Sequence, residues 1–176
     1  MQVSRQGAIL IAPVLVLFLL LALWLPSRIE APGWTRLELT DAETGSKLLL
    51  VVLRDGEPIT LTWRNSLFGL DVTEVFIAQS GLIVQTEATF ADPRGSTPPL
   101  VSPQDIEDLY HTGGPFSAQG LDRPFSHIVY RVGEIGNPKM WVRDRVVDFK
   151  REVDFGGRVI LTAAKLNRYE SLVARR

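Results

Sequence analysis

The chain has 176 residues, with 19 Lys and Arg against 20 Asp and Glu, a net charge of −1, and no cysteine. A near-neutral chain is a poor candidate for a general nucleic-acid binder, because phosphate contacts need clustered positive charge. The lack of cysteine excludes disulfides, thiolate metal sites and a cysteine nucleophile.

The N-terminal segment, residues 7–25, carries no charge and consists mostly of Leu, Val, Ile and Ala. As a helix it would be about 28 Å long, close to the ~30 Å hydrocarbon core of a bilayer. Trp24 to Arg28 lack the small side chains that a signal-peptide cleavage site needs. We therefore predict an uncleaved transmembrane anchor over residues 7–25, after a short cytoplasmic N-terminus, residues 1–6. A cleaved signal peptide and a buried core helix are the alternatives.

The orientation of this anchor is weakly determined by charge, because Arg5 and the terminal amine face Arg28 and Arg36 across it. The short N-terminal flank and the lack of a second apolar span favour a domain outside the cytoplasm. We therefore expect a single-pass protein of the cell (inner) membrane, in contact with the lipid bilayer. Residues 26–33 would be a linker, and residues 34–176 an extracytoplasmic β-rich domain.

Short β-like segments separated by turn residues follow the linker. Lys47 to Leu53 is a continuous apolar run, typical of a strand buried on both faces. From Leu82 to Phe90, a period of two places four apolar residues on one face, namely Leu82, Val84, Ala88 and Phe90. Further strands are predicted at residues 34–40, 59–64, 72–78, 125–132, 139–143, 145–149 and 158–164.

The middle of the chain differs, because residues 91–103 contain four prolines and are predicted to lack regular structure. Ser102 is placed as an N-cap and Pro103 as the first residue of a short helix, which Gly113 and Gly114 end. A second, amphipathic helix is predicted within residues 165–176.

These elements amount to about eight or nine short strands and one short helix in the extracytoplasmic part. Turn signals recur every 8–12 residues, about the spacing typical of a small β-sandwich or barrel. No βαβ alternation is present, which argues against Rossmann and TIM-barrel architectures. The predicted fold class is therefore mainly β, a small β-sandwich or barrel preceded by one transmembrane helix.

Catalytic and metal-binding patterns are not found in the sequence. The two histidines, His111 and His127, lack ligand spacing, and no Gly-x-Ser-x-Gly or phosphate loop is present. We therefore expect no catalytic residue, no metal site and no cofactor, and we expect that the protein is not an enzyme.

Glu74 is the most informative polar residue, because a period of two places it on the same strand face as Val72 and Phe76. A buried carboxylate needs hydrogen-bond donors. Those predicted are Arg64, Asn65 and Ser66, at the end of the preceding strand. The group of Arg64, Asn65, Ser66 and Glu74 is either a ligand-binding site or a structural clasp. A raised Glu74 pKa in an open cleft would favour the site, and closure by Arg64 would favour the clasp.

Two stretches carry a family resemblance: Leu61 to Phe76 continuing through Ser80-Gly81-Leu82, and Met140 to Phe149 followed by Gly156 to Leu161. They resemble a family of small extracytoplasmic domains of unknown function, encoded beside or fused to TAXI-type TRAP solute transporters. The family's motif positions are occupied by Ser66, Glu74, Phe76, Gly81 and Leu82. Asn65 stands where the family usually has histidine, and its Gly-Ala-Gly turn, expected after Phe90, is absent.

The resemblance implies a non-enzymatic accessory role near a transporter. The leading functional hypothesis is therefore a membrane-anchored β-domain that binds a partner, with TRAP-type transporter subunits as the candidates. The alternative is a small membrane-tethered ligand-binding or hydrolytic domain that uses Glu74 with Asn65 and Ser66. A third possibility is a structural module of the cell envelope.

Overall fold

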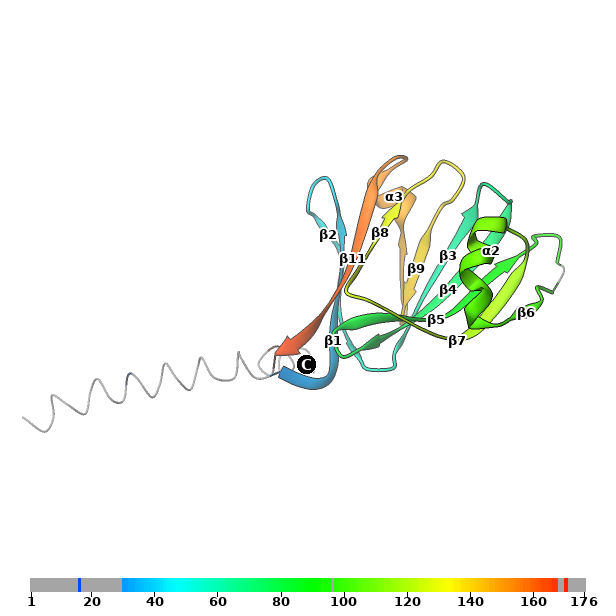
Figure 1. Ribbon diagram of the computed structural model, residues 1–176. Coiled ribbons are helices and arrows are strands. Elements are labelled where there is room, and N and C mark those ends of the chain that lie inside the picture. Colours follow the sequence, from blue (N-terminus) through cyan, green and yellow to red (C-terminus); the bar gives the residue numbers. More distant parts are fainter. Residues whose placement is uncertain (1–15, 17–29, 96, 168–169, 171–176) are drawn as a thin grey trace, which may run out of the picture. The chain divides into compact units, whose positions relative to one another are not determined.

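Two antiparallel-rich sheets dominate the computed structural model, which describes residues 16, 30–95, 97–167 and 170 (Figure 1). The four-stranded sheet has the order β2 (Lys47–Arg54), β1 (Glu30–Asp41), β11 (Arg158–Asn167), β8 (His127–Arg131). The seven-stranded sheet has the order β10 (Arg145–Asp148), β9 (Lys139–Val142), β3 (Pro58–Asn65), β4 (Leu70–Gln79), β5 (Leu82–Ala91), β7 (Phe116–Phe125), β6 (Leu100–Val101). The prediction of a mainly β fold is confirmed, with eleven strands in the described residues instead of eight or nine.

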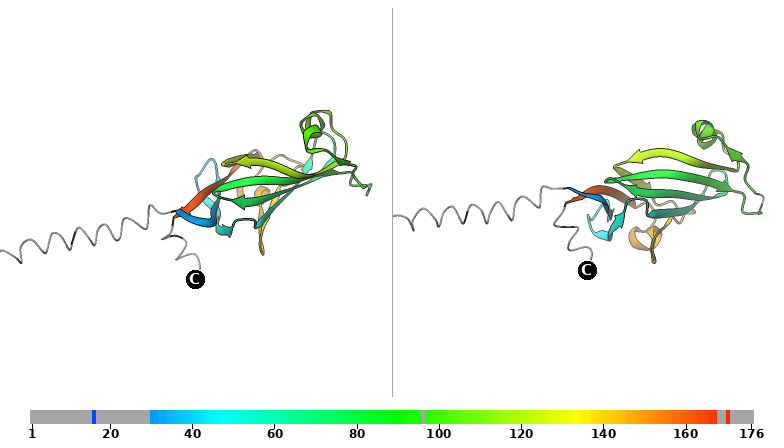
Figure 2. Two further views of the ribbon diagram at one scale, coloured as in Figure 1. Left: turned by 60° about the horizontal axis from the view of Figure 1, so that its bottom comes forward. Right: turned by 90° about the horizontal axis from the view of Figure 1, so that it is seen from below.

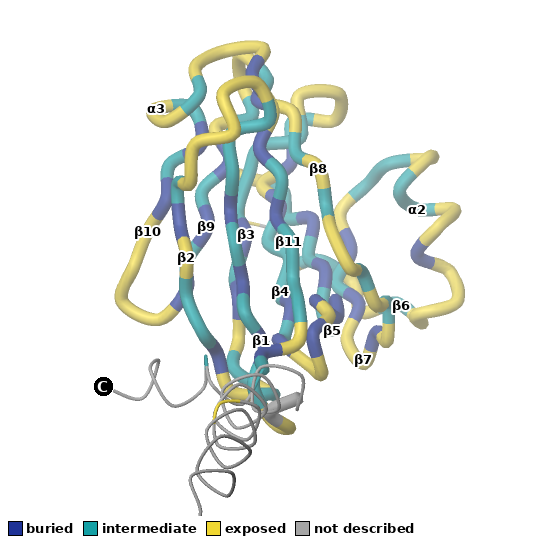
Figure 3. The backbone as a smooth tube through the Cα atoms, turned by 90° about the vertical axis from the view of Figure 1, so that its left-hand side faces the viewer, coloured by how far each residue is buried: buried dark blue, intermediate teal, exposed yellow. Residues whose placement is uncertain are grey.

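The main hydrophobic core lies between the two sheets, within the compact unit of residues 33–165. Buried residues alternate with less buried ones along strands of both sheets, as the dark blue segments of the backbone in Figure 3 show. Leu37 and Leu39 from β1 and Ile59 and Leu61 from β3 are completely buried there. These are the alternations that the sequence predicted, because one face of each strand is apolar.

The second hydrophobic cluster lies under α2 (Ile106–Thr112), at one end of the seven-stranded sheet (Figure 2). As predicted, Ser102 caps the short 3-10 helix η1 (Pro103–Asp105) that leads into α2, and Gly113 ends α2. Tyr110 from α2 meets Phe90 and Phe116 of the sheet, with ring centroids 5.3 and 6.0 Å away. The aromatic contacts fix α2 on β5 and β7.

Strand β2 corrects one prediction, because it is an edge strand and is not buried on both faces. Leu49 and Leu53 face the core, whereas Leu50 on the other face is 47% exposed. Its continuous apolar sequence is therefore compatible with burial of one face only.

Strand β5 corrects another prediction, because a β-bulge interrupts its period of two. Phe76 of β4 pairs with Gln85, but Val75 pairs with Glu87, so Thr86 is the extra residue. The faces of β5 therefore switch at Thr86: Ile83 and Gln85 point inward before it, Ala88 and Phe90 after it. Leu82, predicted on the same face as Ala88 and Phe90, is 36% exposed, whereas those two residues are buried.

Four segments differ from the prediction, either because they were not predicted or in their extent. Strand β7 and the short helix α3 (Phe149–Val153) were not predicted, and β11 continues to Asn167 where the second helix was expected to have begun. Strand β1 begins at Glu30, within the stretch predicted as a linker. The predicted anchor, residues 7–25, lies outside the described residues except for Val16. In the part of the chain that is described, no helix is long and apolar enough to cross a membrane.

Candidate functional site

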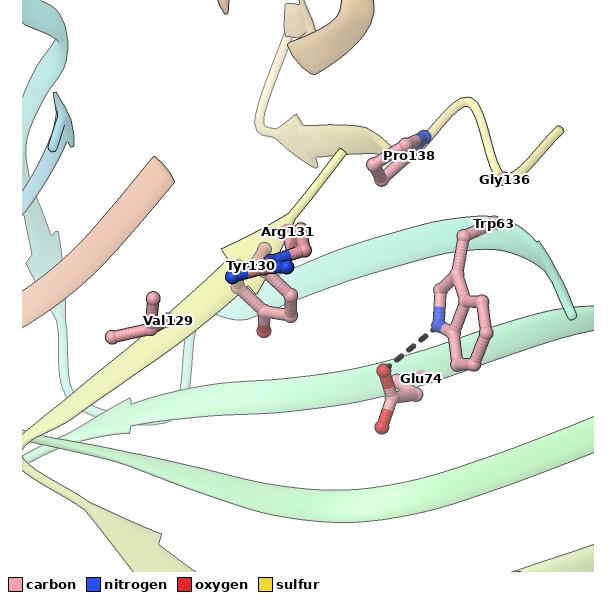
Figure 4. Close-up of a pocket in the computed structure, with 7 residues that line it drawn as sticks. All are labelled: Trp63, Glu74, Val129, Tyr130, Arg131, Gly136 and Pro138. Atoms are coloured by element: carbon pink, nitrogen blue, oxygen red, sulfur yellow. Dashed lines mark hydrogen bonds between the residues drawn. The ribbon is translucent and has the colours of Figure 1, made fainter. Parts of the chain in front are cut away.

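A pocket of about 200 Å³ opens between β8 of the four-stranded sheet and β3 and β4 of the seven-stranded sheet (Figure 4). The Glu74 carboxylate and the Tyr130 hydroxyl both point into it. Exposed Val129 and Arg131 lie on the β8 side of this space. We call it the Glu74 pocket, and its lining residues are Trp63, Glu74, Val129, Tyr130, Arg131, Gly136 and Pro138.

Glu74 is held by two neutral donors from the neighbouring strands. The indole N–H of Trp63 on β3 donates to Oε2 at 3.1 Å, and Nε2 of Gln85 on β5 donates to Oε1 at 2.8 Å. Each carboxylate oxygen keeps a further lone pair for another donor. Glu74 has no Lys or Arg partner within ion-pair distance among the described residues.

The position of Gln85 follows from the β5 bulge, which turns its side chain inward to 2% exposure. Its amide is oriented by two further contacts. Nε2 also donates to the Tyr110 hydroxyl at 3.4 Å, and Oε1 accepts from Nη1 of Arg123 at 3.5 Å. Arg123 in turn forms a 2.6 Å ion pair with Glu107. Arg123 therefore acts on Glu74 through a neutral amide instead of a direct ion pair.

Burial raises the pKa of Glu74, and this effect outweighs the hydrogen bonds from Trp63 and Gln85 and the charge of Arg123, which lower it. Burial, followed by the negative charge of Glu74, also raises the pKa of Tyr110 to about 12. Among the described residues, the Glu74 carboxylate has no ion-pair partner that would stabilise its charged form. A cationic group that entered the pocket would therefore interact with it strongly.

The Tyr130 hydroxyl is buried and has no hydrogen-bond partner among the described residues. Burial raises its pKa, with the charge of Glu74 adding to the effect. Its ring packs against Phe149, with centroids 5.7 Å apart, and the Trp63 ring packs edge-on against Phe90 at 6.0 Å. Both aromatic walls are therefore fixed, and an unpaired buried hydroxyl is costly unless a ligand satisfies it.

The predicted group of Arg64, Asn65, Ser66 and Glu74 is not brought together. Arg64 forms a 2.8 Å ion pair with Asp71, its cross-strand neighbour. Oδ1 of Asn65 accepts from the backbone N–H groups of Leu67 and Phe68 within its own turn. Ser66 is exposed.

The reason is the phase of strand β3, in which Arg64 lies on the face opposite to Trp63. Trp63 pairs with Val72, so Glu74 is its diagonal neighbour on the same face. Arg64 contributes to the pocket by another route, because its backbone N–H donates to the Gly136 carbonyl at 2.8 Å. This bond holds the loop after β8 beside the pocket.

Two residues of the site, Trp63 and Gln85, were not predicted as partners of Glu74. Trp63 could have been found from the β3–β4 hairpin register. Gln85 could not, because its inward direction depends on the bulge. Within the described residues, no group of three or more His, Asp or Glu side chains is arranged to hold a metal ion.

No family model matches the chain, and no curated protein or solved structure shows significant similarity to it. The resemblance to the transporter-associated family therefore stays a prediction.

Proposed function

We propose that residues 33–165 form a binding domain whose Glu74 pocket receives a small polar ligand, and that this domain does not catalyse a reaction. The observation that carries the proposal is the facing pair inside the pocket: a carboxylate with only neutral donors, and a buried hydroxyl without a partner in the described chain. Polar groups that converge in a pocket with fixed aromatic walls are typical of ligand sites. Arg64 does not cover Glu74, which argues against the simple clasp.

The proposed setting is extracytoplasmic. The uncharged run over residues 7–25 supports a single membrane anchor next to the β-rich domain. Carbonate washing of membranes should leave the full-length chain in the pellet. Release of an N-terminally trimmed chain into the supernatant would contradict the anchor.

The ligand-binding proposal is tested by thermal shift of the purified full-length chain against a library of small polar metabolites. Wild type should gain stability with at least one compound, since a ligand that binds only the native state stabilises it. The variant Glu74→Gln should lose that gain, and the variant Glu87→Gln, outside the pocket, should keep it. A library without hits, or hits equal in wild type and Glu74→Gln, would overturn the proposal.

The second candidate function is docking to a transport component. It is supported by the resemblance to the transporter-associated family and by one structural observation. The turn between β3 and β4 lies inside the stretch that carries the family resemblance. In this turn the side chain of Leu67 is 80% exposed and that of Phe68 is 37% exposed. Exposed apolar side chains on a turn are suited to a protein contact. Cross-linking to a co-expressed TRAP-type permease should be lost in Leu67→Ser and retained in Leu100→Ser, which changes a comparably exposed leucine elsewhere.

A further inference from the structure

The pocket carries opposite charges on its two sides. Glu74 lies on β4 and Arg131 on β8, and both line the same cavity. Arg131 is exposed and has no ion-pair partner among the described residues. Neither side chain therefore has an ion-pair partner within the described part of the chain, and both line the space that a ligand would occupy.

The volume restricts the size of the ligand. Liquid water occupies about 30 Å³ per molecule, so a cavity of about 200 Å³ holds roughly seven atoms of that size. This is below the range of about 300–1,000 Å³ that drug-sized ligands occupy. A molecule of the size of alanine or serine fits this volume as a whole, whereas a nucleotide or a peptide would extend out of the pocket.

The groups around Glu74 favour an ammonium as the part of the ligand that contacts the Glu74 carboxylate. The free lone pairs of Glu74 and the oxygen of Tyr130 accept hydrogen bonds, and an ammonium donates three. The aromatic walls Trp63 and Tyr130 also favour a cation over an anion. A guanidinium on the β8 side suits a carboxylate, which it can bind through two parallel hydrogen bonds.

We infer that the Glu74 pocket binds a small zwitterion of amino-acid size, with its ammonium group toward Glu74 and Tyr130 and its carboxylate toward Arg131. This inference rests on the proposed function and names the class of ligand.

Isothermal titration of the full-length chain with glycine, L-alanine and L-serine tests the inference, with ethylamine and propionate as molecules that carry only one of the two charges. At least one zwitterion should bind about tenfold or more tightly than either singly charged probe, because each of these loses one charged hydrogen-bonded pair.

The variants separate the two ends of the ligand. Arg131→Gln should weaken zwitterion binding about tenfold and leave ethylamine binding unchanged. Its matched control is Arg158→Gln, which changes the exposed cross-strand neighbour of Arg131 outside the pocket. Tyr130→Phe removes only the hydroxyl, so it keeps the packing on Phe149 and should weaken binding of both zwitterion and ethylamine.

Affinity should also rise with pH, because the ammonium binds the ionised form of Glu74. The groups that face Glu74 are Gln85, Tyr110, Tyr130 and Arg123, with Arg131 across the pocket. Of these, Glu74 is the carboxyl group whose pKa burial raises, whereas burial moves the pKa of Tyr110 and of Tyr130 further above the ordinary tyrosine value.

The possible results distinguish a failure of the zwitterion inference from a failure of the proposed binding function. The inference that the ligand is a zwitterion would be wrong if a zwitterion and one singly charged probe bound equally tightly, or if Arg131→Gln bound the zwitterion with unchanged affinity. In both cases the proposal that the pocket binds a ligand would still stand. The same conclusion follows if library compounds bind through Glu74 but no zwitterion does. If neither the library nor the zwitterions bind, the proposed function fails with the inference.

Discussion

Gln85 donates a 2.8 Å hydrogen bond to Glu74 only because Thr86 is an extra residue in β5. Without the bulge, residue 85 would lie on the outer face of the seven-stranded sheet, and Glu74 would have Trp63 as its single donor. β-Bulges reorient side chains in this way, and they are over-represented beside functional sites. The hydrogen bonding of Glu74, which lines the pocket, thus depends on an irregularity of the strand.

The first prediction concerns Gln85→Ala, which should lower the free energy of unfolding by about 2–3 kcal/mol. The side chain is 2% exposed, and its removal takes one of two hydrogen-bond donors from Glu74, takes one acceptor from Arg123 and opens a small void. Urea unfolding followed by circular dichroism measures the loss. Gln79→Ala, at the exposed end of β4, is the control and should change stability by less than about 0.5 kcal/mol. A Gln85→Ala variant as stable as this control would show that the hydrogen bond is not maintained in solution.

The second prediction concerns the pH dependence of stability. The pKa of Glu74 is raised in the folded chain, so the native state holds the proton more tightly than the unfolded state does. The free energy of unfolding should therefore fall as the pH rises from the ordinary glutamate pKa near 4.5 to the pKa of Glu74 in the folded chain. Above that pKa it should level off. Asp41, Glu57 and Asp92 have lowered pKa values and titrate below this window.

Urea unfolding at a series of pH values from about 4.5 upward measures this slope. Glu74→Gln does not titrate, so its stability should be flat over the same range, whatever its level. A wild-type slope that persists in Glu74→Gln would assign the effect to another group.

The faces of most strands could be predicted from the sequence, because burial of one face imposes a period of two. Leu37, Leu39, Ile59 and Leu61 are buried as that pattern requires. The prediction was wrong in β5 from the point at which the bulge shifts the phase. Nothing in the composition of Gln85, Thr86 and Glu87 marks the position, because the bulge is set by pairing with β4 and β7.

Strand β7 was missed for a related reason. Gly120 and Pro124 lie within it, and both residues are typical strand breakers. The proline is tolerated because β6 pairs only with Ser117 and Ala118, which leaves the rest of that side of β7 as an edge. Edge strands accept proline, since the missing N–H is not needed for a second neighbour.

The candidate site was predicted in part. Glu74 was identified because a carboxylate between Val72 and Phe76 conflicts with an apolar face, and the structure buries both neighbours. Its donors were misassigned to Arg64 and the residues after it, which follow Trp63 in sequence. Hairpin register, rather than sequence proximity, decides cross-strand contacts, and it selects Trp63.

The third prediction concerns the ion pair of Glu57 with Arg143, whose Nε and Nη2 donate to the carboxylate at 2.8 and 2.9 Å. The hydrogen bond from Arg143 holds the pKa of Glu57 below its usual value. The pair therefore stabilises the fold at neutral pH and loses this effect as the pH falls through the folded pKa.

Because both side chains are partly exposed, Glu57→Gln should cost less than about 1 kcal/mol at neutral pH. Unfolding curves of wild type and variant at neutral and at acid pH provide the measurement, and the difference should vanish in acid. Glu43→Gln, which changes an exposed carboxylate in the turn after β1, should show no difference at either pH. A cost for Glu57→Gln that is equal at both pH values would rule out the ion pair as its cause.

The fourth prediction concerns Gly81, in the turn between β4 and β5. Its φ is +80°, and a Cβ at this position would lie 2.5 Å from the backbone nitrogen of Lys165 on β11. Gly81→Ala therefore combines an unfavourable left-handed conformation with a backbone clash, and should lower the free energy of unfolding by about 2–5 kcal/mol. Gly45→Ala is the matched control, because Gly45 has a similar φ of +69° but nothing within 4 Å of its added Cβ. The control should lose only about 1 kcal/mol, the cost of the conformation alone. Urea unfolding of the two variants side by side measures the difference, and equal losses would mean that β11 does not approach the turn as closely as 2.5 Å.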